Sequence, residues 1–200
     1  MLDARIRPLI DPPLDRLGRA LAGRGIGADT VTLVGLALGL IAAGTIALGW
    51  PGLALGPLLA SRVLDGLDGA VARASRPSDF GGYLDIWCDF VFYGAVPLAF
   101  ALAQPANAPA AAFLLFAFYV NGSSFLGYAA MAAKRGAETT AQGRKSLYYS
   151  AGLLEGTETI VFFVVLCLLP GWFAPLAWTF GALCLLTAAA RVLNARHTLL

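Results

Sequence analysis

Four aspartates with regular spacing carry the clearest chemical signal in the sequence. They lie in two largely apolar segments, DGLDGAVAR at residues 65–73 and GGYLDIWCD at residues 81–89. A carboxylate at membrane depth is costly, and several carboxylates close together also repel one another. A divalent cation relieves both penalties, because carboxylate oxygens bind it and it brings two positive charges. The aspartates therefore predict a metal centre, formed by Asp65, Asp68, Asp85 and Asp89.

The spacing of these aspartates indicates the elements that position them. Asp65 and Asp68 are three residues apart and Asp85 and Asp89 are four apart, so each pair shares one face of a helix. The short polar stretch 74–80 makes the two helices antiparallel neighbours. At ~1.5 Å per residue, Asp68 and Asp85 then lie ~6–8 Å from the helix ends, and Asp65 and Asp89 lie ~12 Å in. Such a hairpin gathers four carboxylates in a volume that suits two divalent cations ~3.5–4 Å apart.

The rest of the chain indicates an all-α integral membrane protein. Of its 200 residues, 58% are hydrophobic and only 13% are charged, which excludes a soluble globular domain and a disordered chain. Apolar stretches of about 20 residues recur, long enough to cross a bilayer as helices. We predict six transmembrane helices in one membrane domain, residues 29–200, at roughly 29–49, 53–73, 81–104, 109–133, 147–169 and 172–194.

Residues 1–28 are predicted to form a cytoplasmic juxtamembrane segment. They contain five arginines and no continuous apolar core, which is unlike a signal peptide. We expect residues 12–23 to form an amphipathic helix on the membrane surface that starts at Pro12 and Pro13. Its apolar residues recur at helical spacing, at Ile10, Leu14, Leu17 and Leu21.

Basic residues are distributed unevenly over the predicted helices. The connections near 49–52, 104–108 and 169–172 contain no Lys or Arg, and apart from Arg62 the 14 basic residues lie on or close to the other side. By the positive-inside rule, both termini and the mouth of the aspartate cluster face the cytoplasm. We expect a multi-pass protein of a bacterial inner (cytoplasmic) membrane, in contact with membrane lipids.

The cysteines and the single histidine exclude several other chemistries. Cys88, Cys167 and Cys184 lie singly in apolar helices without paired spacing, which argues against a disulfide framework and against zinc ligation. His197 is the only histidine and lies in the last four residues, so histidine-based catalysis is not expected. We expect no nucleic-acid partner.

The two aspartate segments resemble the signature of the CDP-alcohol phosphotransferase family, D-x-x-D-G-x-x-A-R followed by G-x-x-x-D-x-x-x-D. The gap between Arg73 and Gly81 holds seven residues, where eight is more usual. The segment Asp29 to Thr32 is similar to an Asn/Asp-x-x-Thr segment that opens the first spanning helix of the family. The signature positions matched here are Asp65, Asp68, Gly69, Ala72, Arg73, Gly81, Asp85 and Asp89.

The resemblance implies a reaction and a role for each matched aspartate. A phosphatidyl (substituted phosphate) group is transferred from a CDP-linked lipid, such as CDP-diacylglycerol, to an alcohol hydroxyl in phospholipid biosynthesis, and CMP is released. Two Mg²⁺ or Mn²⁺ ions are implied, the first on Asp65, Asp68 and Asp85 and the second on Asp65, Asp85 and Asp89. Asp89 is also implied to be the general base.

The resemblance further implies a nucleotide site and an assembly. Gly69, Arg73 and Ser78 would hold the CDP moiety, which a guanidinium suits because it grips phosphate oxygens. The residues of the first helix that would join them are Asp29, Thr30, Val31 and Thr32. A homodimer is expected.

The acceptor alcohol is less well defined. Candidate pocket residues are Asn121, Lys134, Arg135, Glu155 and Glu158. The two glutamates would repel a phosphorylated acceptor, and Phe90 stands where a basic residue is common in the family. We therefore favour an acceptor without phosphate. The glutamates could instead pair with Arg62, and polar residues such as Asn121 are more often interhelical hydrogen bonds.

Other readings of the aspartates stay open at this point. The donor could be a CDP-headgroup with diacylglycerol as acceptor, or the acceptor could be glycerol or inositol phosphate. An aspartate could simply pair with Arg62 or Arg73. An intramembrane prenyltransferase would also use aspartates and metal, and an ion or proton transporter would use carboxylates without catalysis.

Overall fold

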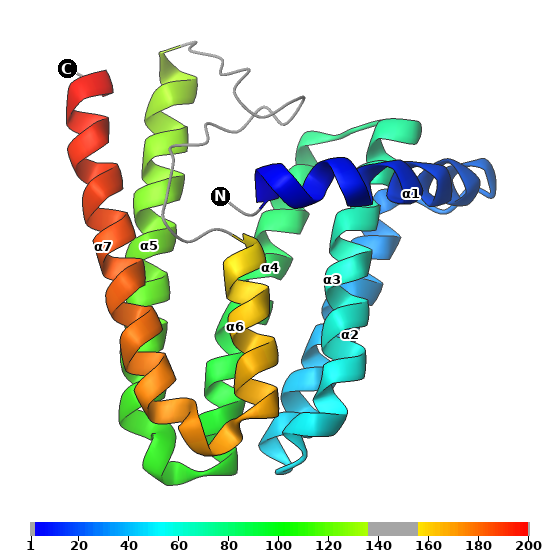
Figure 1. The fold of residues 1–200 in the computed structure, drawn as a ribbon. Coiled ribbons are helices and arrows are strands. Elements are labelled where there is room, and N and C mark those ends of the chain that lie inside the picture. The colour runs from blue at the N-terminus through cyan, green and yellow to red at the C-terminus, as the bar shows by residue number, and fades with distance from the viewer. Residues whose placement is uncertain (1–2, 136–155, 200) are drawn as a thin grey trace.

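A computed structural model describes residues 3–135 and 156–199 of the chain as a helical bundle (Figure 1). Within these ranges every regular element is a helix and none is a strand. In chain order they are α1 (Asp3–Gly23), α2 (Ala28–Ala47), α3 (Pro51–Ala74), α4 (Asp79–Ala103), the short η1 (Pro105–Asn107), α5 (Ala108–Lys134), α6 (Gly156–Leu168), the short η2 (Pro170–Trp172) and α7 (Phe173–Leu199). The all-α prediction is confirmed for the described residues.

Helices α2 to α7 run along the bundle, and α1 lies across one end of it (Figure 1). Helix α1 packs against α3, α2 packs against both α3 and α4, and α5 packs against α4 and α7. The α2–α3 turn, η1 and η2 lie at the end opposite α1, whereas the α3–α4 turn lies at the α1 end (Figure 1). The three connections without basic residues are therefore at the same end of the molecule.

Four helical segments are long and apolar enough to cross a membrane: Ala28–Ala47, Asp79–Ala103, Pro105–Lys134 and Pro170–Arg196. They correspond to four of the six predicted spans. Helix α3 occupies the position of another predicted span, but it contains Arg62, Asp65, Asp68 and Arg73, which lower its mean hydropathy. Helix α6 is described for only 13 residues. For α3 and α6, membrane crossing stays a prediction.

The N-terminal helix is longer than the sequence indicated. It begins at Asp3 rather than at Pro12, so Pro8, Pro12 and Pro13 lie inside it. A proline removes one helical hydrogen bond, but its fixed φ angle is compatible with a helix, and here the helix continues through all three. The predicted apolar stripe divides into two parts. Leu14 and Leu21 pack against α2 and α3, whereas Ile10 and Leu17 are exposed.

Two apolar clusters hold the bundle together, and they lie at opposite ends. The larger one is built from the halves of α2 to α7 nearest the uncharged connections, and includes Leu58, Phe92, Phe163 and Phe173. The smaller one joins α1, α2 and α3 around Val31, Leu67, Ala70 and Val71. The predicted aspartates lie on α3 and α4 between these two clusters.

Small residues allow α2 to approach α3 and α4 closely. A Cβ atom added to Gly39 would lie 2.7 Å from Cδ2 of Phe92 and 3.0 Å from Oγ of Ser61. A Cβ added to Gly35 would lie 3.3 Å from Cβ of Leu64. Gly35 and Gly39, four residues apart, therefore both face the neighbouring helices. The similar pair Gly52 and Gly56 has no atom within 4 Å of an added Cβ.

Candidate metal centre

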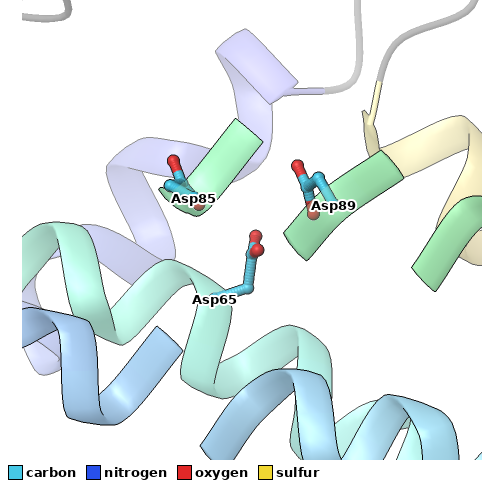
Figure 2. Close-up of side chains that lie close together, drawn as sticks. All are labelled: Asp65, Asp85 and Asp89. Atoms are coloured by element: carbon cyan, nitrogen blue, oxygen red, sulfur yellow. The ribbon is translucent and has the colours of Figure 1, made fainter. Parts of the chain in front are cut away.

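Three of the four aspartates meet in one group. Asp65 on α3 and Asp85 and Asp89 on α4 each place one carboxylate oxygen within 4.8 Å of the others. Figure 2 shows these three side chains pointing toward one another from the two neighbouring helices. All three residues are half-buried, so the group is neither sealed in the core nor fully in solvent.

The turn between α3 and α4 sets the register of this group. Helix α3 ends at Ala74, and the backbone N–H of Ser75 donates to the carbonyls of Val71 and Ala72. Ser78 then caps α4, since its Oγ accepts a hydrogen bond from the N–H of Gly81 at 2.9 Å. Serine is a favoured N-cap residue because it satisfies a free N–H of the first turn. Ser78, predicted to contact CDP, thus also fixes where α4 begins.

Asp68 lies outside the group of three. Its Oδ2 accepts a hydrogen bond of 2.6 Å from the hydroxyl of Thr32 on α2, and both residues are buried. The Thr32 hydroxyl is also 3.1 Å from the carbonyl oxygen of Ala28. The sequence predicted four carboxylates in one volume and placed Thr32 in the nucleotide site. The observed contact makes Thr32 the partner of the fourth aspartate.

Arg62 belongs to the site, although sequence reasoning regarded it only as a possible structural partner. Its Nη1 is 2.7 Å from Oδ1 of Asp89 and 3.4 Å from Oδ1 of Asp65. The signal was present in the sequence, because Arg62 lies three residues before Asp65 and so shares its helix face. The spacing did not reveal the link to Asp89, because that residue is on the next helix.

The predicted nucleotide-binding residues gather at the α1 end of the bundle. The Asp29 carboxylate lies against the start of α4, since a Cβ added to Gly81 would be 3.0 Å from its Oδ1. A Cβ added to Gly69 would lie 3.4 Å from Nη1 of Arg73. In the same segment Thr30 is exposed, whereas Val31 is buried in the smaller apolar cluster. Asp29, Gly69 and Arg73 thus offer polar or open surface near the α3–α4 turn.

Arg73 has a partner that the sequence did not indicate. Its Nη2 is 2.8 Å from Oδ1 of Asp15 on α1, and both side chains are partly exposed. The two helices touch closely beside this ion pair, because a Cβ added to Gly18 would be 2.7 Å from the carbonyl carbon of Ala70. Nothing in the local sequence pairs Asp15 with Arg73, which lie 58 residues apart.

The predicted acceptor residues divide into two groups. Asn121 on α5 accepts hydrogen bonds from Arg191 of α7, at 2.9 Å to its side-chain oxygen and 3.1 Å to its backbone oxygen. Ser124 accepts a third, at 2.7 Å. Arg191 is only 5% exposed, and the sequence analysis did not single it out. Asn121 therefore makes the interhelical hydrogen bond that was the alternative reading of this residue.

The remaining acceptor candidates lie on other parts of the bundle. Lys134 and Arg135 are exposed at the C-terminal end of α5. Glu158 is half-buried in the first turn of α6. Glu155 lies outside the described residues.

A packing contact places Asn121 at the depth of the acidic group. The ring of Phe90, which follows Asp89, lies against Gly122, which follows Asn121. A Cβ added to Gly122 would overlap Cε1 of Phe90. Because neighbouring residues on each helix share a level, the polar cluster around Arg191 lies at the level of Asp89.

The chemistry of the acidic group fits a divalent cation. Three convergent carboxylates are the hard oxygen ligands that Mg²⁺ and Mn²⁺ prefer. Gly69 leaves room for a phosphate to approach, and the partly exposed Arg73 offers it a positive charge. The three cysteines are free and buried in the bundle.

This fold and site define a class of membrane transferase. The sequence profile of the CDP-alcohol phosphatidyltransferase family matches residues 26–193, and the chain belongs to this family. Members of the family transfer phosphatidyl groups from a CDP-alcohol to an alcohol acceptor in phospholipid synthesis. The resemblance inferred from the aspartate segments is thereby confirmed.

Two curated proteins are similar to this chain. "Inner membrane protein YnjF" of Escherichia coli (strain K12) is 51% identical over 200 residues, which cover 100% of this chain and 97% of that protein. "Archaetidylinositol phosphate synthase" of Pyrococcus horikoshii is 37% identical over 100 residues, which cover 50% of this chain and 53% of that protein.

Proposed function

We propose that this protein transfers a substituted phosphate group from a CDP-linked lipid, such as CDP-diacylglycerol, to the hydroxyl of a small alcohol, and releases CMP. The observation that carries the proposal is the convergence of Asp65, Asp85 and Asp89 within 4.8 Å. In a member of this family, such a group suits a polyanionic pyrophosphate bridged by metal ions.

The aspartates would hold two divalent cations, Mg²⁺ or Mn²⁺. Asp65, Asp68 and Asp85 would contribute to one ion, and Asp65, Asp85 and Asp89 to the other. When bound, these ions neutralise the pyrophosphate and stabilise the charge that grows on the departing CMP. Asp68 would join the first ion from outside the group of three, where its Oδ2 accepts the 2.6 Å hydrogen bond from Thr32.

The protein's own side chains would bind the donor and move the proton. Arg73 would grip phosphate oxygens at the mouth of the site, where Gly69 allows the phosphate to approach. The segment Asp29 to Thr32 and Ser78 would contact the rest of the CDP moiety. Asp89 would accept the proton of the attacking hydroxyl, as the resemblance to the family implies.

For the acceptor, we propose first an alcohol without phosphate. Glu158, half-buried at the start of α6, would repel a phosphate and could pair with the ammonium of an amino alcohol. Asn121, Lys134, Arg135 and Glu155 complete the proposed pocket. A phosphorylated acceptor is the second candidate. It is favoured by the buried guanidinium of Arg191 at the depth of Asp89 and by the synthase from Pyrococcus horikoshii.

The proposed placement in the cell follows from charge and similarity. We propose that the chain resides in the inner membrane of a bacterium. The name of the Escherichia coli relative gives this location for that protein. Residues 29–200 would form a six-helix membrane domain with both termini in the cytoplasm, and residues 1–28 would lie on the cytoplasmic surface. A homodimer is the proposed assembly.

The proposal is tested by substrate turnover with purified protein. CDP-diacylglycerol with Mg²⁺ and a panel of alcohols, phosphorylated and not, should give CMP and one new lipid, identified by mass. EDTA should abolish turnover and added Mg²⁺ or Mn²⁺ should restore it. Lipid formation only from a CDP-headgroup and diacylglycerol would reverse the donor assignment. If CMP forms but none of the alcohols in the panel is converted to a lipid, both acceptor proposals are wrong.

Asp89→Asn tests the proposed base, which is also a proposed ligand of the second ion. Amide and carboxylate have nearly the same shape, but the amide cannot accept the proton, so we expect CMP release to fall by about a hundredfold or more. CDP should still bind, as measured by its effect on thermal unfolding. Full turnover by Asp89→Asn would contradict the assigned role.

A further inference from the structure

We propose that Arg62 is a resident cation of the acidic centre, which takes the place of one divalent ion until the pyrophosphate donor arrives. The inference rests on the proposed metal centre and deepens it. Arg62 would hold Asp65 and Asp89 in position in the empty protein and would weaken binding of the ion that uses these two carboxylates.

The guanidinium lies directly on candidate metal ligands. Nη1 of Arg62 is 2.7 Å from Oδ1 of Asp89 and 3.4 Å from Oδ1 of Asp65. A divalent ion of this type binds carboxylate oxygen at about 2.0–2.2 Å and needs a free lone pair on it. Arg62 already contacts this oxygen, Oδ1 of Asp89. A metal ion that binds the same oxygen must displace the guanidinium or share the oxygen with it.

A dedicated cradle on three helices holds the guanidinium there. The Arg62 side chain is only 7% exposed, its Cζ lies 3.9 Å from the centre of the Phe92 ring, and Nη2 donates to Oγ of Ser61 at 3.0 Å. Gly39 of α2 makes room for both supports, since any added Cβ would be 2.7 Å from the ring. The cation therefore has a π face, a hydroxyl and two carboxylates around it.

One donor of this side chain is left without a partner. Nε of Arg62 is buried and makes no hydrogen bond within the described part of the chain. Burying a donor without a hydrogen bond is costly. The side-chain conformation of Arg62 is therefore not the one that would give all of its own donors a partner. Nε stays unbonded while Nη1 contacts both aspartates and Nη2 donates to Ser61, which is the arrangement expected of a built-in counter-charge.

Charge counting explains why the second ion would need the donor. The four aspartates proposed as ligands carry a formal charge of −4, and Arg62 reduces it to −3. One divalent ion would leave −1, and a second ion would leave a net positive charge of +1. A guanidinium keeps its charge at any pH that the protein tolerates, so it cannot leave by losing a proton. A second ion becomes favourable when the pyrophosphate brings further negative charge and offers its own oxygens.

The test counts metal ions in the absence of the donor. Purified protein is titrated with Mn²⁺, and free Mn²⁺ is measured by electron paramagnetic resonance. The unaltered protein should bind one ion tightly, and Arg62→Met, which removes the charge at similar length, should bind two. Its second ion should bind about tenfold or more tightly than in the unaltered protein. Arg62→Lys, which keeps the charge, should stay closer to the unaltered protein.

A second measurement is the thermal unfolding of the protein without added metal. Without metal, Arg62→Met leaves the carboxylates uncompensated, so its thermal unfolding should begin lower and be restored by Mn²⁺ more than in the unaltered protein. If Arg62→Met cannot be purified even with Mn²⁺, Ser61→Ala replaces it. Ser61→Ala removes one hydrogen bond of the guanidinium but keeps its charge. The second Mn²⁺ should bind this variant more tightly than the unaltered protein, as it does in Arg62→Met.

The outcomes separate this inference from the proposed function. Equal ion counts and affinities in the unaltered protein and the charge-removing variant would overturn the role of Arg62 and leave the metal centre intact. Absence of Mn²⁺ binding in every variant would overturn the metal centre and the inference with it. Two tight ions in the unaltered protein would also reject the inference.

Discussion

At the scale of single residues, the site depends on contacts between positively charged, hydroxyl and carboxylate groups that lie on different helices. Asp89 contacts Arg62, Asp68 contacts Thr32, and Arg73 contacts Asp15. The first two contacts satisfy carboxylates that are partly or fully buried in the apolar bundle, whereas the third is an ion pair between partly exposed side chains. The machinery is therefore not the aspartates alone but the aspartates together with the groups that orient them.

Thr32→Val is a direct test of one orienting contact. Valine keeps the branched shape but removes the hydroxyl, so buried Asp68 loses its 2.6 Å hydrogen bond. We expect a loss of about 1–3 kcal/mol in the free energy of unfolding. Thr32→Ser keeps the hydroxyl and is the matched control. If the two variants unfold alike in thermal melts in detergent, the hydrogen bond does not stabilise the site.

At the scale of elements, the α3–α4 hairpin carries the chemistry and its neighbours hold the hairpin in place. Ser78 sets the first turn of α4, and α1 clamps the end of α3 through the close contact of Gly18 with Ala70. Helix α2 supports both halves, since it packs against α3 and α4. The position of the aspartates is thus determined by two further helices, α1 and α2, besides the turn of their own hairpin.

Two alanine substitutions in α2 separate packing from helix propensity. Gly39→Ala adds a Cβ that would lie 2.7 Å from the Phe92 ring, so we expect a loss of about 1–3 kcal/mol in stability from overpacking. Gly44→Ala lies in the same helix with nothing within 4 Å of its added Cβ, and should be neutral or stabilising by up to about 1 kcal/mol.

Thermal unfolding of both α2 variants gives the answer. Because Phe92 and Ser61 also support Arg62, Gly39→Ala should alter Mn²⁺ binding as well, whereas Gly44→Ala should not. Equal stability of the two variants would show that α2 can shift away from α3 at no cost.

At the scale of the whole molecule, charge and apolar surface are divided between the two ends of the bundle. The larger apolar cluster lies toward the uncharged connections, and the acidic group and exposed arginines lie toward α1. Exposed tryptophans, Trp50 and Trp172, stand at the uncharged end, as interfacial anchors do. This polarity is what a membrane protein with a cytoplasmic site requires.

The orientation can be measured by labelling introduced cysteines in intact cells. Gln104→Cys lies at the uncharged end and should react with a membrane-impermeant thiol reagent from outside. Ala74→Cys lies at the α3–α4 turn and should react only after the cells are opened. The three native cysteines are buried and should give little background. The reverse pattern would place the site on the outer face.

The sequence was sufficient for the hairpin and for the family. The spacings of three and four residues around a short polar turn determine which carboxylates share a face, because helix geometry is local. The same motif carried the resemblance that the family match over residues 26–193 confirms. The start of α1 was misjudged, because the paired prolines suggested that the helix begins at Pro12, whereas it begins at Asp3 and continues through them.

What only the tertiary structure decided is how residues far apart in the chain divide the charge among themselves. The sequence determined by itself that the aspartates of α3 and α4 would meet, since they are near one another along the chain and helices repeat regularly, although three of the four converge. It did not determine that Arg62 bridges to Asp89, that Thr32 draws Asp68 aside, or that Asp15 holds Arg73. Those pairings depend on the rotation of each helix about its axis, which is set by side-chain packing between helices and not by spacing within one.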